Sequence, residues 1–417
     1  MAEKSGLKVL IVGAGIGGLT AALALRQQGH EVEVFEKSRL ASEVGAAIHA
    51  APNCTALWNR LGLKPEEFGG VFCKTMLFLN AKTEVMFRKD YIEEAKLWQA
   101  GYFYLHRVDL HNELKHKATS PTGAGIPVKL HTASAVTTVD CAAATITLAD
   151  GRTLSGDLVI GADGIHSRTR EAVTGKKYAL ESSGKACFRF LIPFNQLHDD
   201  PETRIFVENP GAGVQVTGPD SRHIVFYPCS DNTLVNVVAV VKKEMVGNIE
   251  QGWSQDANKE NMVKLFSEGF SPAVHKMLEK APDDDIKIFD LLDMEVLPTW
   301  IRGRTALLGD AAHPFLPFMG QGAAQAVEDA CTLAALLPLG TVAEDVPKRL
   351  EVYEKARKER ADWVQDFTRK RGRDPSGKDG PVPTPAEFEM AIKQCLAHNA
   401  WNHAVSVGRD HGIEISS

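Results

Sequence analysis

Two groups of residues near the start of this 417-residue sequence have the types and spacing that nucleotide chemistry needs. Gly13-Ala14-Gly15-Ile16-Gly17-Gly18 satisfies the pattern G-x-G-x-x-G, and Glu36 follows 18 residues after Gly18. In such a loop Gly13 permits a tight turn, Gly15 lets a diphosphate approach the backbone, and Gly18 lets a helix and a strand pack closely. A carboxylate placed like that of Glu36 accepts hydrogen bonds from ribose hydroxyls. Together these residues predict a dinucleotide site.

The elements around this loop fit the same use. Residues 7–12 form a short apolar run, residues from 16 to Gly29 have a helical pattern, and residues 31–35 alternate like a second strand. This arrangement is a βαβ unit of about 30 residues. The start of its helix offers free N–H groups and a positive dipole end to a diphosphate. A glycine-rich turn without a ligand would not require this context.

Two acidic turns follow apolar, strand-like runs further along the chain. Asp163 lies in the segment DLVIGADGIHSR, residues 157–168, and Asp310 lies in LGDAAHP, residues 308–314. The segment PFMGQG, residues 317–322, follows the turn that contains Asp310. Either aspartate could simply cap a helix. Each of the two turns follows a run that reads as a core strand.

Between these two turns the pattern changes. Strand-like runs are separated by Gly, Pro and Asn turns and predict a mostly antiparallel sheet, which residues 68–104 are expected to join. The runs are 189–192, 204–207, 222–227 and 233–241. Helices are predicted at 322–337 and 346–371, followed by a Gly/Pro-rich loop at 372–385 and a last helix.

The composition excludes several classes of protein. Hydrophobic residues at 44% and charged residues at 24% are ordinary for a folded globular chain. A net charge of −6 argues against nucleic-acid binding, and no run is apolar and long enough for a membrane span. The seven cysteines show no CxxC spacing, so we predict no metal site and a cytoplasmic location with reduced thiols. No Ser-His-Asp arrangement or HExxH motif is present.

The three motifs together resemble the FAD-dependent aromatic hydroxylases, the single-component flavoprotein monooxygenases typified by salicylate and para-hydroxybenzoate hydroxylases. The glycine fingerprint with Glu36, the segment 157–168 (the DG segment) and the segment 308–322 (the GD segment) carry the resemblance, which extends over about residues 7–365. The sequences GAAI followed by Pro52-Asn53, and His106-Arg107-Val108-Asp109-Leu110, also match. Residues 44–53 are similar to fungal members especially.

The resemblance implies an α/β fold with three parts. A Rossmann-like FAD-binding domain would comprise residues 1–67, 105–175 and 291–340. An inserted, mostly antiparallel β-sheet substrate domain would comprise 68–104 and 176–290. The C-terminal helical region would be 341–417.

The resemblance also implies which residues bind FAD. Asp310 would hydrogen-bond the ribityl hydroxyls, Arg107 would lie along the flavin chain, and Asp163 would link flavin and pyridine-nucleotide binding. The helix that begins near Gly322 would aim its positive end at the flavin. The other expected FAD contacts are Lys37, Ala47, Pro317 and Ala323. Because no second G-x-G-x-x-G follows a strand, NADH or NADPH would bind only transiently.

Three residues are candidates for substrate binding and catalysis. Arg189 lies between apolar residues, where an unpaired cation is costly, so it pairs either with a phenolate or carboxylate or with a structural acid. It resembles an arginine that fungal polyketide-type phenol hydroxylases place against the substrate phenolate. Tyr227 could bind the same oxygen and His49 could face the substrate ring; each could instead be a core residue. We expect His313 to serve the structure of its motif.

The resemblance finally implies a reaction. Substrate binding would promote reduction of FAD by NADH or NADPH, and a flavin C4a-hydroperoxide formed with O₂ would hydroxylate a phenolic, salicylate-like or polyketide-derived aromatic molecule. Two further alternatives are hydroxylation accompanied by decarboxylation and hydroxylation accompanied by loss of aromaticity. The alternatives are a flavin oxidase or dehydrogenase, which would turn over without NAD(P)H, and a catalytically silent FAD-binding protein. We expect a monomer or homodimer.

Overall fold

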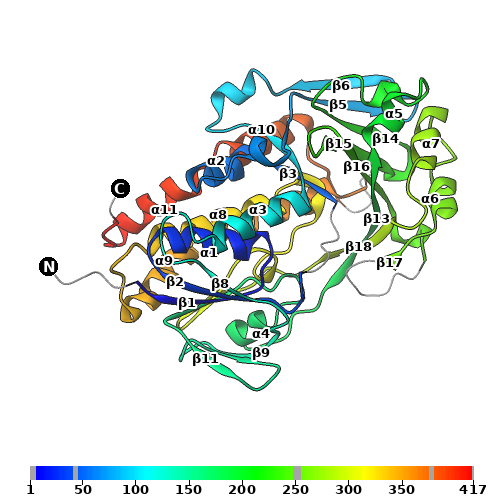
Figure 1. Ribbon diagram of the computed structural model, residues 1–417. Helices are drawn as coiled ribbons and strands as arrows, with labels where there is room; N and C mark the ends of the chain where they lie inside the picture. The colour runs from blue at the N-terminus through cyan, green and yellow to red at the C-terminus, as the bar shows by residue number, and fades with distance from the viewer. Residues whose placement is uncertain (1–5, 41–45, 248–254, 375–379, 416–417) are drawn as a thin grey trace.

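Two large sheets and a layer of helices make up the computed structural model, which describes residues 6–40, 46–247, 255–374 and 380–415 (Figure 1). One sheet carries the glycine loop and the two acidic turns. The other sheet lies beside it and is formed by the middle of the chain.

The first sheet has six strands in the order β19-β20-β12-β1-β2-β8, all parallel except the β19–β20 pair. Its strands are β1 (Lys8–Val12), β2 (Glu31–Phe35), β8 (Lys129–His131), β12 (Leu158–Gly161), β19 (Ile301–Arg302) and β20 (Thr305–Leu307). The adjacent central strands β1 and β12 are apolar and largely buried because both faces of the sheet are covered. Helices α1 (Ile16–Gln27), α3 (Arg107–Thr119) and α8 (Gly322–Leu336) lie over one face (Figure 1). The carboxyl ends of β1, β12 and β20 therefore bring the three predicted motifs to one edge.

The second sheet has eight strands in the order β17-β18-β13-β16-β15-β14-β5-β6 and is antiparallel except for the β14–β5 pair. Its strands are β5 (Thr75–Asn80), β6 (Val85–Asp90), β13 (Glu181–Pro193), β14 (Ala212–Thr217), β15 (His223–Cys229), β16 (Leu234–Lys242), β17 (Gln255–Asp256) and β18 (Lys287–Asp293). Side chains alternate between its faces. Phe188 and Phe190 pack in a core with Val274 of α7, whereas Cys187 lies on the opposite face and packs with Leu316 of the GD segment.

Two three-stranded sheets and further helices complete the described fold. The sheet β3-β7-β4 joins the two large sheets, and β11-β10-β9 lies with α4 below the first sheet (Figure 1). These strands are β3 (Ala47–Ala50), β4 (Val71–Phe72), β7 (Phe103–His106), β9 (Val136–Asp140), β10 (Thr145–Leu148) and β11 (Thr153–Ser155). The remaining helices are α2 (Pro52–Arg60), α4 (Thr169–Thr174), α5 (Phe194–His198), α6 (Lys259–Leu265), α7 (Pro272–Glu279), α9 (Val346–Arg371), α10 (Pro385–Leu396) and α11 (Ala400–Asp410).

The fold class predicted from the sequence is confirmed, and three details are corrected. Residues Arg204–Phe206 form a short 3-10 helix rather than a strand. Only β5 and β6 of the segment 68–104 join the eight-stranded sheet, since β4 and β7 pair with β3. Two helices, α10 and α11, follow the predicted Gly/Pro-rich loop where one helix was expected, and residues 375–379 of that loop lie outside the described ranges. The exact domain boundaries stay a prediction.

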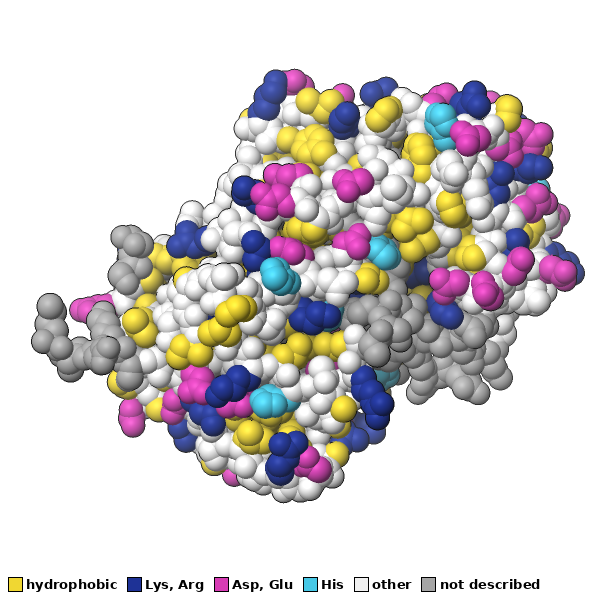
Figure 2. Space-filling model, viewed as in Figure 1, with side chains coloured by type: hydrophobic (Ala, Val, Ile, Leu, Met, Phe, Trp, Pro, Cys, Tyr) yellow, Lys and Arg dark blue, Asp and Glu magenta, His cyan; other side chains and the backbone are white. Residues whose placement is uncertain are grey.

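Three observations concern membrane spans, cysteines and surface charge. No helix in the described ranges combines the length and apolarity that crossing a bilayer requires. All seven cysteines are buried and unpaired. Figure 2 shows basic and acidic side chains interspersed over one face of the molecule, as the small net charge of −6 leads us to expect.

Candidate functional site

The three glycines of the fingerprint have different surroundings. Gly13 has a φ of +103°, and a Cβ there would lie 2.4 Å from the carbonyl oxygen of Ala162. A Cβ on Gly18 would lie 2.1 Å from the carbonyl oxygen of Gly13. A Cβ on Gly15 would meet nothing within 4 Å. Gly13 and Gly18 are therefore needed by the fold, whereas Gly15 borders open space at the start of α1, where a diphosphate would approach.

Glu36 lies directly after β2, beside this loop. Its carboxylate accepts hydrogen bonds from the backbone N–H of Ala14 at 2.9 Å and of Ser38 at 2.8 Å. These bonds hold the carboxylate next to the glycine turn. Lys37, the next residue, is exposed. Partial burial lowers the pKa of His166, and the positive charge of Lys37 lowers it further.

Asp163 organises the DG segment. Its carboxylate accepts hydrogen bonds from the hydroxyl of Ser167 at 2.6 Å, the backbone N–H of Arg168 at 2.9 Å, and both the N–H and hydroxyl of Thr169 at 3.1 Å. The carboxylate thus shapes the turn before α4, as a helix cap would. Its link to pyridine-nucleotide binding stays a prediction.

Arg170, which the sequence analysis did not single out, joins the DG and GD segments. Its guanidinium is buried and donates to the carbonyl oxygens of Ile165 at 2.8 Å, Asp310 at 2.6 Å and Ala311 at 2.8 Å. A buried cation with several carbonyl acceptors is satisfied without a carboxylate. Arg170 therefore sets the spacing between the two turns that carry Asp163 and Asp310.

The carboxylate of Asp310 is available to a ligand. It forms no hydrogen bond with any residue of the described ranges, and its side chain is accessible to solvent. The carboxylate nevertheless lies deep among protein atoms, whose desolvating effect raises its pKa even though His313, Arg170 and Arg107 oppose that change. It lies in the 3-10 turn Gly309–Ala311 after β20, and this turn packs against α8, whose first residue Gly322 has no atom within 4 Å of a Cβ position.

A buried network of charges lies behind the GD segment. Asp329 of α8 accepts from the N–H of Gly309 at 2.9 Å, from His313 Nε2 at 2.6 Å and from Arg357 Nε at 2.8 Å. Its neighbour Glu328 pairs with Arg357 and with Arg360 of α9. Burial alone would raise the pKa of Asp329, but His313 and Arg357 outweigh it and lower that pKa.

This network also reaches the start of α8. Asn53 of α2 donates to Glu328 Oε1 at 2.6 Å and to the side-chain oxygen of Gln321 at 3.0 Å. Gln321 is the residue immediately before α8. The network therefore holds the GD turn and the positive end of α8 in one arrangement, and the expected structural role of His313 agrees with its contact.

Arg107 and Ala47 meet at the junction of the two sheets. Arg107 begins α3, and its backbone N–H bonds the carbonyl oxygen of Ala46 at 3.2 Å. Ala47 donates its N–H to Asn236 Oδ1 at 2.9 Å and accepts from the hydroxyl of Tyr227 at 3.0 Å. The backbone of β3 is thereby attached to the eight-stranded sheet.

Arg189 and Tyr227 lie on the face of the eight-stranded sheet that meets the GD segment, whereas His49 lies on β3. Arg189 follows Cys187 by two residues on β13, where Cys187 packs with Leu316, and its charge affects Tyr227. Burial raises the pKa of Tyr227, and the positive charge of Arg189 opposes this. The ring of His49 lies 4.5 Å from that of Tyr227 in an edge-on arrangement. Since the hydroxyl of Tyr227 is bonded to Ala47, its direct contact with substrate stays a prediction.

The residues present fit FAD. Gly15 leaves room for a diphosphate, Asp310 offers a carboxylate without a protein donor, and the N-terminal N–H groups of α1 and α8 have no side-chain cap. Pro317 is exposed, and Ala323 lies in the first turn of α8. The bond partners that each predicted cofactor residue would have remain expectations.

The contacts that the sequence analysis missed are those of Arg170 and of the network. A signal was present for the network, because Glu328 and Asp329 interrupt an otherwise small and apolar helix. Which cations would pair with them could not be inferred, since Arg357 lies 29 residues beyond Glu328 on a helix rich in charges.

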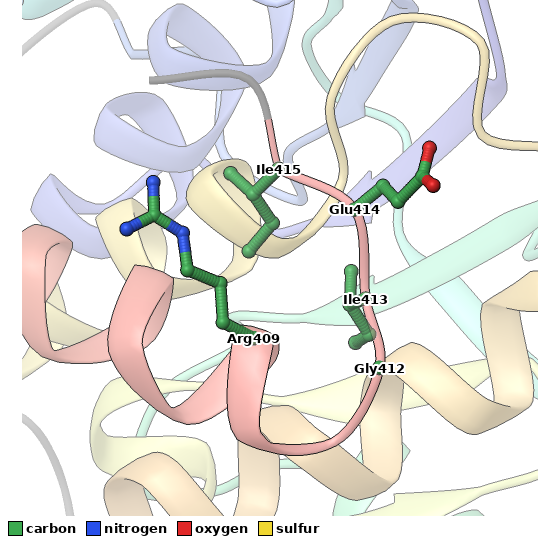
Figure 3. Close-up of a pocket in the computed structure, with 5 residues that line it drawn as sticks. All are labelled: Arg409, Gly412, Ile413, Glu414 and Ile415. Carbon is green, nitrogen blue, oxygen red and sulfur yellow. The ribbon is translucent and has the colours of Figure 1, made fainter.

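A surface depression of about 620 Å³ lies far from these turns (Figure 3). It is lined by Arg409, Gly412, Ile413, Glu414 and Ile415. This region lies at the C-terminal end of α8, because a Cβ on Gly408 would contact Leu336, the last residue of that helix. The GD segment lies at the opposite, N-terminal end of α8. A 15-residue helix is about 22 Å long, so this depression does not belong to the site above.

Comparison with known proteins agrees with this geometry. The family model described as "FAD binding domain" matches residues 6–368. Hispidin-3-hydroxylase of Neonothopanus nambi is 38% identical over 374 residues, covering 87% of each chain. A structure of CtdE in complex with FAD and a substrate superposes with a TM-score of 0.82 at 22% identity, covering 97% of this chain and 98% of that one. A salicylate hydroxylase substrate complex has a TM-score of 0.78 at 25% identity, covering 97% and 98%.

The chain belongs to the FAD-binding-domain family of flavoprotein monooxygenases. It is an FAD-dependent enzyme of the aromatic hydroxylase type, and FAD is its cofactor.

Proposed function

We propose that this enzyme hydroxylates a phenolic or salicylate-like small molecule that Arg189 holds as an anion. NADH or NADPH and O₂ are the co-substrates. When bound, FAD supplies the redox chemistry, which is its reduction by the nicotinamide and the transfer of one atom of O₂ to a ring carbon. The protein has to bind the aromatic ring, keep its oxygen ionised and exclude water.

The observation that carries the proposal is the environment of Arg189. Its Nε is buried without a hydrogen-bond partner, and no ion pair within the described ranges includes its guanidinium. Its cross-strand neighbours are Val238 and Lys287, neither of them an acid, and its guanidinium carbon lies 5.8 Å from the Phe289 ring centre. The alternative that Arg189 pairs with a structural acid therefore has no support in these contacts.

Arg189 is half-buried, and a buried donor such as its Nε is costly to leave without an acceptor. A phenolate or a carboxylate would satisfy the guanidinium, and an electron-rich phenolate is also the form of a phenol that attacks an electrophilic oxygen. One relative is named as a hydroxylase of hispidin and one structural neighbour as a hydroxylase of salicylate, and these names support an aromatic substrate of this kind here.

Other features belong to the proposal as predictions. The fungal relatives favour a role in secondary metabolism, including polyketide-derived substrates. We predict a cytoplasmic monomer or homodimer. Whether hydroxylation is accompanied by decarboxylation or loss of aromaticity depends on the substrate.

The test is NADH and NADPH consumption by the FAD-loaded enzyme, with and without a panel of phenols and salicylates, with products identified by mass. A substrate that accelerates consumption and gains one oxygen supports the proposal. Turnover without NAD(P)H would indicate an oxidase or dehydrogenase instead. Absence of any stimulated reduction across the panel would direct the search first to non-phenolic substrates.

The role of Arg189 has its own variants. Arg189→Ala should abolish stimulated turnover while leaving FAD bound, and Arg189→Lys should restore part of it, because a cation remains but the planar fork of donors is lost. Arg152→Ala is the control, since Arg152 pairs with Asp150 at the surface. An unchanged turnover rate in Arg189→Ala would remove Arg189 from the substrate site.

A further inference from the structure

The ring of His49 is held on several sides. Its Nδ1 lies 2.8 Å from the hydroxyl of Tyr102, and its ring centre lies 5.2 Å from that of Tyr104 and 4.5 Å from that of Tyr227. The GD segment closes another side, because a Cβ on Gly320 would lie 3.3 Å from Nδ1. Each of these contacts restricts rotation of the ring.

His49 is neutral in this environment. Burial, and after it the charge of Arg189, lowers the pKa of His49 to about 4. The titratable and charged groups around it are the three tyrosines Tyr102, Tyr104 and Tyr227, together with Arg189. A neutral imidazole carries a single N–H, so one ring nitrogen donates and the other accepts.

The bond to Tyr102 decides which nitrogen has the proton. A phenolic O–H is a stronger donor than a neutral imidazole N–H, and an imidazole nitrogen is a stronger acceptor than a phenol oxygen. Tyr102 therefore donates to Nδ1, which places the proton on Nε2. Within the described ranges Nε2 has no hydrogen-bond partner.

His49 shares its surroundings with Arg189. The charge of Arg189 acts on both His49 and Tyr227, whose rings are in contact. A cationic donor with an unpartnered Nε and a neutral donor with an unpartnered N–H thus lie in one region, next to the GD segment. Two donors without a protein partner in one region can bind acceptor oxygens of a ligand.

We propose that Tyr102 is a positioning residue that holds His49 in its Nε2–H tautomer. His49 then selects aromatic substrates that present an acceptor oxygen to it in addition to the anionic oxygen held by Arg189. This inference rests on the proposed function for the identity of the substrate, but the tautomer itself does not depend on it. No bond forms or breaks in this recognition step.

The tautomer is measured directly by ¹⁵N NMR of the FAD-loaded enzyme labelled at histidine, with His49→Gln used to assign the signals. The wild type should show the pattern of an Nε2–H imidazole, and Tyr102→Phe should shift it towards a mixture of tautomers. Tyr91→Phe is the matched control, because Tyr91 stacks on Tyr102 at 5.6 Å without bonding His49. An Nδ1–H pattern in the wild type, or an identical pattern in Tyr102→Phe, would overturn the inference.

The selection is measured by ligand binding to the oxidised enzyme, followed by the absorbance of the flavin. Phenol provides one oxygen, whereas catechol, resorcinol and salicylate each provide a second acceptor. Tyr102→Phe should weaken binding of at least one two-oxygen ligand about fivefold and that of phenol less than twofold, as the loss of one neutral hydrogen bond predicts. In a His49→Gln background, which keeps a side-chain N–H, Tyr102→Phe should have no further effect.

The outcomes separate the two claims. An equal loss for phenol and for every two-oxygen ligand, in both backgrounds, would mean that Tyr102 only supports the structure and would overturn the selection. If Arg189→Ala leaves binding of all four ligands unchanged, the proposed function fails at Arg189. The NMR result would then still establish or refute the tautomer by itself.

Discussion

The network behind the GD segment and the sheet face around Arg189 use buried polar groups in opposite ways. In the network, Arg357 pairs with both Glu328 and Asp329. Asp329 in turn accepts from the N–H of Gly309, in the turn that carries Asp310. On the sheet face, the Nε of Arg189 has no partner.

The difference separates a part of the protein that is complete by itself from a part that a ligand completes. Paired buried charges hold one arrangement of α8 and the GD turn, because removing any partner leaves the others desolvated. An unpaired buried donor costs stability and is retained where a ligand satisfies it. We therefore expect changes in the network to act on folding and cofactor binding, and changes on the sheet face to act on turnover.

The largest effect is expected from Arg357→Leu. This change leaves two buried carboxylates without their shared cation and should lower the free energy of unfolding by about 3–5 kcal/mol. Thermal unfolding of the FAD-loaded protein, followed by circular dichroism, measures it. Arg152→Ala, which removes a surface ion pair, should shift the midpoint little. A similar midpoint for both variants would contradict the view that the network is structural.

Asp310→Ala should mainly weaken FAD binding. The carboxylate has no partner in the described part of the protein, so its removal costs the apo fold little but removes an acceptor for the cofactor. A charged hydrogen bond contributes about 1.5–3 kcal/mol, which corresponds to a dissociation constant raised about 10- to 100-fold. Flavin fluorescence on dilution measures this constant. A variant purified with full FAD occupancy and wild-type affinity would exclude Asp310 from the cofactor site.

Gly15→Ala and Gly13→Ala distinguish a glycine that cofactor binding requires from a glycine that folding requires. Gly15 has a φ of −71°, which alanine adopts freely, and a Cβ there meets nothing in the protein. Gly15→Ala should therefore fold normally but bind FAD about tenfold more weakly, since the methyl group would occupy space next to the diphosphate. Gly13→Ala should unfold at lower temperature because of its positive φ and its contact with Ala162. Normal FAD affinity in Gly15→Ala would contradict this placement of the diphosphate.

The smallest effect is expected from acid. Arg360 and Arg357 lower the pKa of Glu328 despite burial, and the pKa of Asp329 is lowered as well. A carboxyl group with a lowered folded-state pKa stabilises the protein above its unfolded pKa, near 4, and this stabilisation is lost as pH falls further. The unfolding midpoint should therefore fall below about pH 4. In Glu328→Gln the fall should be shallower, and an equal slope in both proteins would assign the acid sensitivity to other groups.

The sequence was most informative where local geometry determines function. The glycine loop, Glu36, Asp163 and Asp310 could be recognised because each follows a strand that ends at one edge of a parallel sheet. The prediction of a strand at residues 204–207 was wrong, because a β-branched pattern of four residues is too short to distinguish a strand from a 3-10 turn.

The sequence by itself determined the nucleotide-binding architecture of this protein, because spacing along one strand, turn and helix is a local property. Only the tertiary structure decided which buried charges have partners. Arg170 meets the carbonyl oxygen of Asp310, 140 residues away, and Asn53 meets Glu328, 275 residues away. It also showed that no acid of the described residues pairs with Arg189 and that the hydroxyl of Tyr102 bonds His49. Such pairings depend on how separate elements pack, and no pattern along the chain encodes them individually.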